Sequence, residues 1–128
     1  QRLSRGLGDV YKRQLEYNFN LDDGSLSDKK VFFDFERGLP DGSTIDSEGY
    51  IWNCRWGGSC VVRIDPNGNI DQIYELPVEN VTNCVFGGSD LKTLYITTAF
   101  NEGKHQYDGS LFALNLTIPG LEDNKFKI

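Results

Sequence analysis

Short alternations of apolar and polar residues, separated by turn residues, run along most of the chain. Residues 14–24 alternate Leu15, Tyr17 and Phe19 and end at Asp23-Gly24, and the segments that follow repeat this behaviour. No segment carries a helical stripe of apolar residues, so the pattern predicts an all-β fold. Strands with their turns are expected within residues 14–24, 29–35, 42–49, 50–56, 60–68, 69–77, 80–88, 91–100 and 109–116.

These strands recur with a period near 43 residues, which places Ile51-Trp52 opposite Leu94-Tyr95. Four strands in a unit of this length are typical of a β-propeller blade. A single antiparallel sandwich with accidental self-similarity is the alternative. In the propeller interpretation the chain holds about two and a half blades: the last two strands of one, a complete second, and three strands of a third. Trp52, Phe86, Tyr95 and Phe112 are then expected as core aromatic residues.

The first fourteen residues differ from the rest, with basic residues at Arg2, Arg5, Lys12 and Arg13 and neither strand alternation nor a helical stripe. They resemble translated adaptor read-through at the ends of environmental sequence assemblies. A basic, disordered arm is the alternative. Residues 1–14 are therefore expected to be non-native or disordered, and residues 15–128 to be the folded part.

Composition excludes some classes of function. The net charge of −6 argues against a nucleic-acid binder, which would present a basic face. No stretch reaches the roughly 18 apolar residues of a membrane span. The three cysteines, without a recognisable signal peptide, favour reduced thiols and a cytoplasmic protein. Cys54 and Cys84 fall within strands and are expected to pack as small apolar residues.

Asp41 lies in Pro40-Asp41-Gly42, directly before a strong strand. On local grounds it is a turn residue. In a propeller, the same position begins the innermost strand of a blade, where side chains face the central channel and can bind a cation through oxygen. The other acids of the turns are expected to face solvent, namely Asp22, Asp23, Asp46, Glu48 and Asp65.

Two further positions carry open alternatives. His105, the one histidine, lies in a polar loop. It is either an exposed loop residue or a contact to substrate from a lid. Arg55 precedes Trp56 and Gly57-Gly58. It either stacks with Trp56 as a structural pair or contacts the substrate at the rim of the site. No G-x-S-x-G nucleophile motif accompanies His105, and no loop fits the EF-hand spacing.

Two segments carry a family resemblance. GLPDGSTIDSEGYIWNCRWGGSCVVRIDPNG (residues 38–68) and IYELPVENVTNCVFGGSDLKTLYITTA (residues 73–99) resemble the C-terminal part of the regucalcin, gluconolactonase and sugar-lactonase family. The resemblance extends over residues 15–128. WNCRWGG is most similar to the bacterial sugar-lactonase branch, which includes arabinonolactonase-like members.

The resemblance implies a six-bladed β-propeller that holds one divalent cation, which is calcium, zinc, magnesium or manganese. The family's ligands are a Glu, an Asn and the Asp of the P-D-G run, which is Asp41 here. The Glu and Asn lie upstream of the matching region, as do the family's Arg and Asn substrate contacts. The chain is thus expected to be a fragment with one of three ligands, inactive alone.

The implied reaction is hydrolysis of a small sugar lactone. No nucleic-acid or membrane partner is expected, and the sequence does not indicate the oligomeric state. The cation would polarise the lactone carbonyl or lower the pKa of a bound water. Asp41 would bind the metal and act as general base. Thr82 and Asn83, at the start of the next innermost strand, are expected as further contacts to the substrate or to the ligands. A non-catalytic calcium-binding or scaffold propeller is the alternative.

Overall fold

The computed structural model describes residues 2–5 and 12–127 of the chain. Within these residues the chain forms ten strands and no helix, which confirms the predicted all-β class. The described residues consequently include no helix long and apolar enough to cross a membrane. The strands are β1 (Arg2–Arg5), β2 (Arg13–Phe19), β3 (Leu26–Asp34), β4 (Leu39–Ile45), β5 (Ile51–Trp56), β6 (Cys60–Ile64), β7 (Ile70–Glu75), β8 (Val81–Gly87), β9 (Thr93–Thr98) and β10 (Leu111–Asn115).

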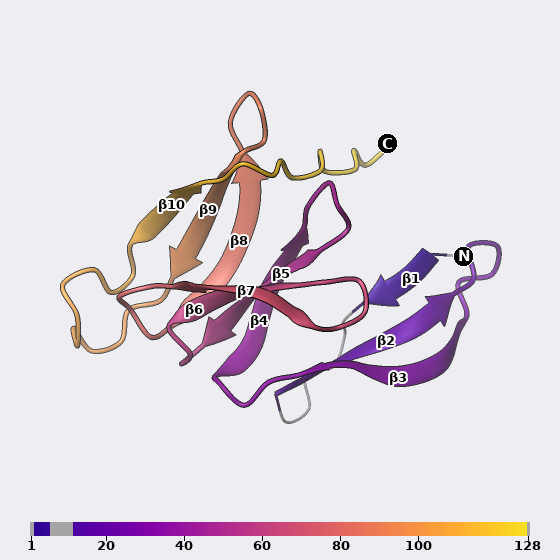
Figure 1. Ribbon diagram of the computed structural model, residues 1–128, viewed down its shortest axis with the longest axis horizontal. Helices are drawn as coiled ribbons and strands as arrows, with labels where there is room; N and C mark the ends of the chain where they lie inside the picture. The colour runs from indigo at the N-terminus through magenta and orange to yellow at the C-terminus, as the bar shows by residue number, and fades with distance from the viewer. Residues whose placement is uncertain (1, 6–11, 128) are drawn as a thin grey trace.

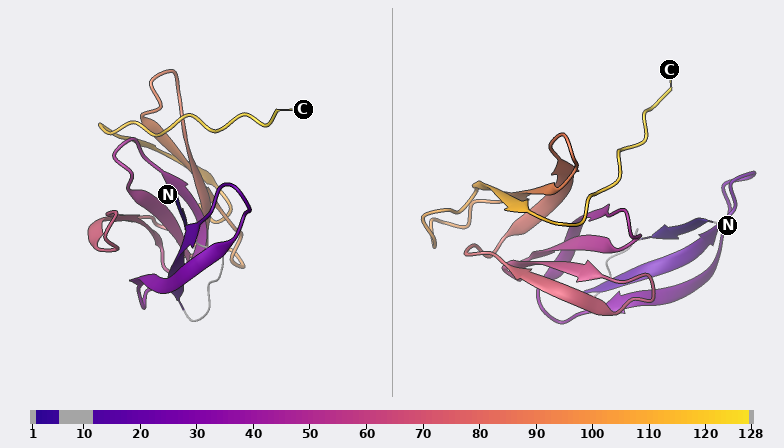
Figure 2. Two further views of the ribbon diagram at one scale, coloured as in Figure 1. Left: turned by 90° about the vertical axis from the view of Figure 1, so that its right-hand side faces the viewer. Right: turned by 45° about the horizontal axis from the view of Figure 1, so that its top comes forward.

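The strands form three antiparallel sheets that follow one another along the chain (Figure 1). The first sheet has the order β1-β2-β3, the middle sheet β4-β5-β6-β7 and the last sheet β10-β9-β8. Figure 2 shows the same succession of sheets from two further directions. The sheets match the predicted succession of a partial, a complete and a partial unit, and the number of blades in a propeller stays a prediction.

The first sheet contains one strand more than predicted. Residues Arg2–Arg5 pair with Glu16–Phe19 of β2, and β2 itself begins at Arg13. Strand pairing therefore extends into the segment 1–14 that the sequence pattern left outside the fold. Residues 1 and 6–11 of that segment lie outside the described residues, and its non-native origin stays a prediction.

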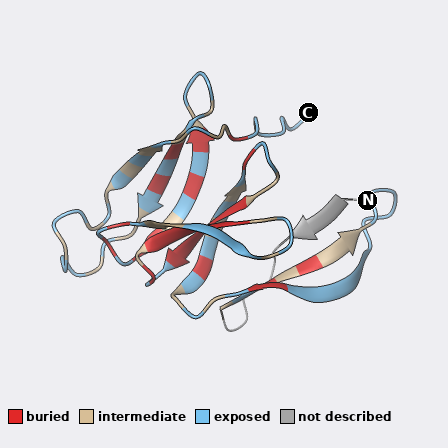
Figure 3. Cartoon of the chain, in the orientation of Figure 1, coloured by how far each residue is buried: buried red, intermediate tan, exposed pale blue. Residues whose placement is uncertain are grey.

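The middle sheet contains more buried residues than either neighbouring sheet, because an apolar cluster packs on each of its faces (Figure 3). Toward the last sheet, Trp52, Cys54 and Val61 pack in a cluster with residues of β8 and β9. Toward the first sheet, Ile51 and Val62 belong to a second cluster with residues of β3. Every residue of β6 is buried, as expected for a strand with neighbours on both faces.

The structural repeat is 42 residues rather than 43. The bounds of β8 and β9 lie 42 positions after those of β4 and β5, from Leu39 to Val81 and from Ile51 to Thr93. Trp52 therefore corresponds to the buried Leu94 and not to Tyr95. The expectation that Tyr95 is a core residue is wrong: it is 37% exposed, because alternate residues of a strand face opposite sides. Trp52 and Phe86 are buried as predicted.

The same turn closes two hairpins of the middle sheet. In β4–β5 and β6–β7, Asp46 and Asp65 each accept hydrogen bonds on Oδ1 from the backbone N–H groups two and four residues later, at 2.9–3.1 Å. Gly49 and Gly68 follow with φ of 81° and 87°, a conformation that glycine adopts at no steric cost. The local sequence Asp-x-x-Gly thus determines both turns.

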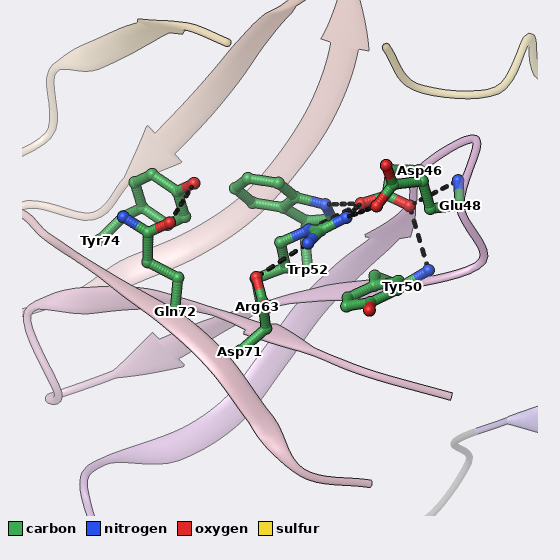
Figure 4. A network of polar contacts seen from close by, with 8 residues as sticks. All are labelled: Asp46, Glu48, Tyr50, Trp52, Arg63, Asp71, Gln72 and Tyr74. Atoms are coloured by element: carbon green, nitrogen blue, oxygen red, sulfur yellow. Dashed lines mark hydrogen bonds and ion pairs between the residues drawn. The ribbon is translucent and has the colours of Figure 1, made fainter. Parts of the chain in front are cut away.

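The two aspartates differ in their surroundings. The expectation that Asp46 faces solvent is wrong, because Asp46 is fully buried. Its Oδ2 accepts hydrogen bonds from Trp52 Nε1 at 2.8 Å and from Arg63 Nε at 2.9 Å (Figure 4). Arg63 also pairs with Glu48 and Asp71, both at 2.8 Å. Burial lowers the pKa of Arg63, but these three carboxylates outweigh it and raise that pKa above its ordinary value.

The C-terminal segment covers this network on one side. The backbone N–H of Ser47 donates to Pro119 O at 2.9 Å, and Asp46 forms a β-bridge with Gly120. Gly120 is packed so closely on Phe86 that an added Cβ would lie 2.2 Å from the ring. The polypeptide after β10 therefore contributes to the burial of Asp46, although it lies more than seventy residues away in sequence.

Asp46 and Asp65 provide a matched pair of variants for urea unfolding of the full-length protein that carries this chain. Asp46→Ala is expected to lower the free energy of unfolding by about 3 kcal/mol, because it leaves Arg63 buried without its central partner. Asp65→Ala removes the same turn contacts at a half-buried position that has no buried arginine partner among the described residues, and it is expected to cost clearly less. Equal losses for the two variants would contradict a central role for the buried pair.

The chain expressed alone is expected to be marginally stable or to aggregate. Large apolar side chains of the outer strands and faces remain exposed among the described residues, including Leu26, Val31, Leu39, Val85 and Leu111 at 46–64%. Open sheet faces and edges of this kind favour association. Size-exclusion chromatography and thermal unfolding provide the measurement. A monomer with a sharp, reversible two-state melt would contradict this expectation.

Candidate functional site

Asp41 lies on β4, the strand at one edge of the middle sheet. The pairing of β4 with β5 shifts by one residue between Pro40 and Ser43, so that Asp41 and Gly42 together lie opposite Cys54. This is a β-bulge, which bends a strand and changes the direction of its side chains. Asp41 is exposed, and among the described residues its carboxylate has no hydrogen-bond or ion-pair partner.

The first strand of the last sheet, β8, lies beside β4 and contacts it. Asn83 of β8 packs directly on Gly42: a Cβ added to Gly42 would lie 2.1 Å from Asn83 Oδ1 and 2.4 Å from its Cγ. Glycine is therefore required at position 42 by the closeness of the neighbouring sheet. Asn83 lies 42 residues after Asp41, so the two residues occupy equivalent positions of the repeat. We refer to Asp41, Gly42 and Asn83 as the β4–β8 seam.

Thr82 and Asn83 have different environments within β8. The pairing of β8 with β9 also shifts here, which makes Thr82 an extra residue of the strand. The Thr82 hydroxyl forms a hydrogen bond of 2.7 Å with the Thr97 hydroxyl. Asn83 Oδ1 accepts a hydrogen bond of 2.9 Å from the N–H of Cys84. Of the two predicted residues, Asn83 is the one that the structure places against the Asp41 bulge.

Buried thiols lie beneath the seam. Cys54 and Cys84 are 0% and 5% exposed and belong to the cluster between the middle and last sheets, as predicted. Cys84 Sγ donates to the carbonyl of Trp52 at 3.7 Å. A hydrogen bond with Cys84, together with burial, raises the pKa of the Cys54 thiol well above its ordinary value. These thiols therefore act as packing groups under the bulge.

The structure does not bring Arg55 to the surface. Arg55 is fully buried, and its guanidinium donates to the carbonyls of Phe35 and Gly38 at 2.8 and 3.0 Å, among other partners. It also lies over the ring of Phe35, 5.4 Å from the centroid. These contacts support a structural role for Arg55 and join the middle sheet to the segment that leads out of β3, whereas its stacking with Trp56 stays a prediction.

His105 lies in the connection between β9 and β10, in a half-buried position. Its Nδ1 accepts from the N–H of Tyr107 at 3.2 Å, and its own N–H donates to Asp108 Oδ2 at 3.2 Å. The ring of Tyr107 is tilted against it with centroids 5.4 Å apart. The contacts of His105 that define its position thus come from its own loop.

Sequence reasoning missed Asn53, the residue next to the bulge. Asn53 is fully buried on β5, and its Nδ2 donates to Asp41 O at 3.0 Å and to Ser43 Oγ at 2.9 Å. The signal was one amide side chain within a strand in which Ile51, Trp52 and Cys54 belong to two apolar clusters. A buried amide of this kind requires partners.

The oxygen donors of the seam fit part of a site for a hard divalent cation. Asp41 offers an exposed carboxylate, which is a ligand that Ca²⁺, Mg²⁺ and Mn²⁺ prefer and that Zn²⁺ also accepts. Residues 2–5 and 12–127 contain no group of three or more His, Cys, Asp or Glu side chains placed to hold a metal ion. Any complete site at Asp41 therefore needs ligands of another kind or from another part of the protein.

Comparison with known proteins finds relatives that are named as sugar lactonases. A pentonolactonase of Haloferax volcanii is 43% identical over 96 residues, which cover 73% of this chain and 32% of that protein. A 6-deoxy-6-sulfogluconolactonase of Pseudomonas putida is 32% identical over 120 residues, which cover 86% and 41%. The chain thus spans well under half the length of these relatives.

A solved structure is similar over nearly the whole chain. Regucalcin of Agrobacterium tumefaciens, described as a calcium-binding protein, superposes with a TM-score of 0.80 at 30% identity, covering 92% of this chain and 43% of that one. The sequence profile of the SMP-30/Gluconolactonase/LRE-like region matches residues 9–100. The chain therefore belongs to the SMP-30/gluconolactonase family, as the motifs in its sequence indicated.

Proposed function

We propose that the chain is the C-terminal part of a divalent-metal-dependent sugar lactone hydrolase, similar to gluconolactonase and arabinonolactonase, built on a six-bladed β-propeller. Two lactonases among its relatives support the reaction class. Three successive antiparallel sheets with a 42-residue repeat support the propeller. Because the chain spans only part of its relatives, the activity belongs to the full-length protein.

The observation that carries this proposal is the environment of Asp41. A carboxylate without a partner among the described residues stands on a bulge, at the contact of two sheets. An aspartate that forms a turn accepts hydrogen bonds from the backbone of that turn, as Asp46 and Asp65 do. Asp41 makes no such bonds, so its side chain is available for a ligand.

Asp41 is proposed to hold the cation with ligands from sequence outside this chain. A divalent cation, supplied as calcium, zinc, magnesium or manganese in the assays below, would polarise the lactone carbonyl as a Lewis acid when bound. Asn83 lies at the same seam and is proposed to contact the substrate or to support Asp41. Thr82 and His105 are proposed as further contacts to the substrate.

Asp41 is also proposed to act as general base. In lactone hydrolysis a water oxygen forms a bond to the carbonyl carbon, and the bond from that carbon to the ring oxygen breaks. A carboxylate can accept the proton of the attacking water and return it to the departing ring oxygen, which becomes a hydroxyl group. The exposed position of Asp41 allows the required contact with water.

A calcium-binding propeller without catalytic activity is the second candidate. The similarity to a regucalcin described as calcium-binding favours it, because a cation site alone would explain the exposed carboxylate. The two candidates share Asp41 as a ligand and differ only in the reaction, since one fold can host both functions.

The test uses the full-length protein with gluconolactone, arabinonolactone and xylonolactone and each of the four cations. Asp41→Asn is expected to lower kcat/KM roughly 100-fold or more, because it removes the charge and the base. Asp65→Asn, on an exposed turn of the same sheet, serves as the control and should leave kcat/KM unchanged. Full activity of Asp41→Asn would remove Asp41 from the site, and cation binding without turnover of any lactone would favour the second candidate.

The chain of 128 residues alone is expected to show no lactonase activity. Its described residues supply one carboxylate at the seam and no cluster of three acidic, His or Cys ligands. The measurement is lactone hydrolysis by the purified chain with and without added divalent cation. Turnover that depends on the cation and disappears with chelator would show that the chain contains a complete site.

A further inference from the structure

The bulge that presents Asp41 is held from inside the middle sheet by a buried side chain. Asn53 of β5 uses both hydrogens of its amide group, one on Asp41 O at 3.0 Å and one on Ser43 Oγ at 2.9 Å. These acceptors lie on either side of Gly42, at the point where the ladder between β4 and β5 is irregular. The side chain thus replaces ladder hydrogen bonds that the bulge disrupts.

The orientation of the Asn53 amide is set by Arg55. Arg55 Nη1 donates to Asn53 Oδ1 at 3.1 Å, and a guanidinium can only donate. The oxygen of Asn53 must therefore face Arg55, which directs Nδ2 toward Asp41 O and Ser43 Oγ. Both residues are 0% exposed, so water does not compete for the hydrogen bond between them.

Arg55 is in turn fixed by the polypeptide that enters β4. Its Nε donates to Arg37 O at 3.0 Å, and its Nη2 donates to Phe35 O and Gly38 O at 2.8 and 3.0 Å. Several donors of one planar group then bind carbonyls of one short segment, which leaves Arg55 little freedom. A continuous set of hydrogen bonds joins this segment through the buried side chains of Arg55 and Asn53 to the backbone of Asp41.

We propose that Asn53 is a positioning residue for Asp41, and that it acts by fixing the backbone of the Asp41-Gly42 bulge so that the carboxylate is held where the cation binds. This inference rests on the proposed function of Asp41 as a metal ligand. Asn83 packs on the other side of the same bulge, so the seam is held from two sheets. The role assigned to Asn53 is distinct, because its hydrogen bonds reach the backbone of the ligand residue itself.

The test is calorimetric titration of Ca²⁺, and separately of Zn²⁺, Mg²⁺ and Mn²⁺, into chelator-treated full-length protein. Asn53→Ala is expected to weaken binding of the cation roughly 10-fold, as the loss of a residue that orients a ligand typically does. Val62→Ala is the matched control: Val62 pairs with Asn53 and is equally buried, but it lies on β6, one strand further from the bulge of β4. It should lose stability without loss of cation affinity.

A second variant covers the case in which Asn53→Ala does not fold. Asn53→Asp keeps the shape and the contact with Arg55 but loses both donated hydrogen bonds to β4. Added negative charge alone would strengthen cation binding, so weaker binding by Asn53→Asp supports positioning. Unchanged or stronger binding overturns the proposal.

The Asp41→Asn background separates this inference from the proposed function. If Asp41→Asn weakens cation binding and adding Asn53→Ala has no further effect, the two residues act as one unit. Independent, additive losses overturn the positioning role and leave Asp41 as a ligand. Wild-type protein that binds none of the four cations, or Asp41→Asn with unchanged affinity, overturns the proposed function and this inference together.

Discussion

The buried ion pair between Asp46 and Arg63 fixes the middle sheet, against which the other two sheets pack. Asp46 follows the end of β4, Trp52 lies on β5 and Arg63 on β6, so one carboxylate connects three consecutive strands. A shift of one residue in the register would turn Arg63 to the opposite face and leave Asp46 buried without a partner. That outcome is costly enough to exclude the alternative register.

A second buried arginine performs the corresponding function on the opposite face. Arg63 lies on the side of Trp52 and the last sheet, whereas Arg55 reaches the polypeptide between β3 and β4. The two arginines differ in their partners: Arg63 pairs with carboxylates, and Arg55 donates mainly to carbonyls. Apolar clusters cover both faces, and these directional contacts determine how the neighbouring segments sit on them.

Local features were predictable from the sequence, and long-range ones were not. Alternation and turn residues determined the strands from β2 to β10, because pleat and turn chemistry act over a few residues. Asp46 and Asp65 have the same local pattern, and only Arg63, Trp52 and the segment around Gly120 make one of them buried. A repeat estimated one residue too long was enough to place Tyr95 on the wrong face.

The candidate site also combines features that the sequence predicts with features that depend on long-range contacts. A family resemblance singled out Asp41, whereas the support of Asp41 by Asn53 depends on strand pairing that no local pattern encodes. Arg55 was a candidate because it is charged, and its burial among carbonyls follows from the path of the segment before β4. The sequence therefore singled out Asp41 and Arg55 as candidates. Only the structure showed that the Asp41 carboxylate is exposed and that the Arg55 guanidinium is buried.

The bulge at Asp41 explains why an exposed carboxylate can stand on a well-packed sheet. A regular strand would give Asp41 a cross-strand partner and would not need a second residue opposite Cys54. With the extra residue, Asp41 shares that partner with Gly42, and Gly42 makes room for Asn83 of the next sheet. The middle and last sheets then each contribute their first strand to a common seam, with Asp41 and Asn83 at equivalent positions of the repeat. Under the proposed function, ligands distributed over successive sheets in this way require that several sheets assemble before a cation can bind, which couples the activity to the complete fold.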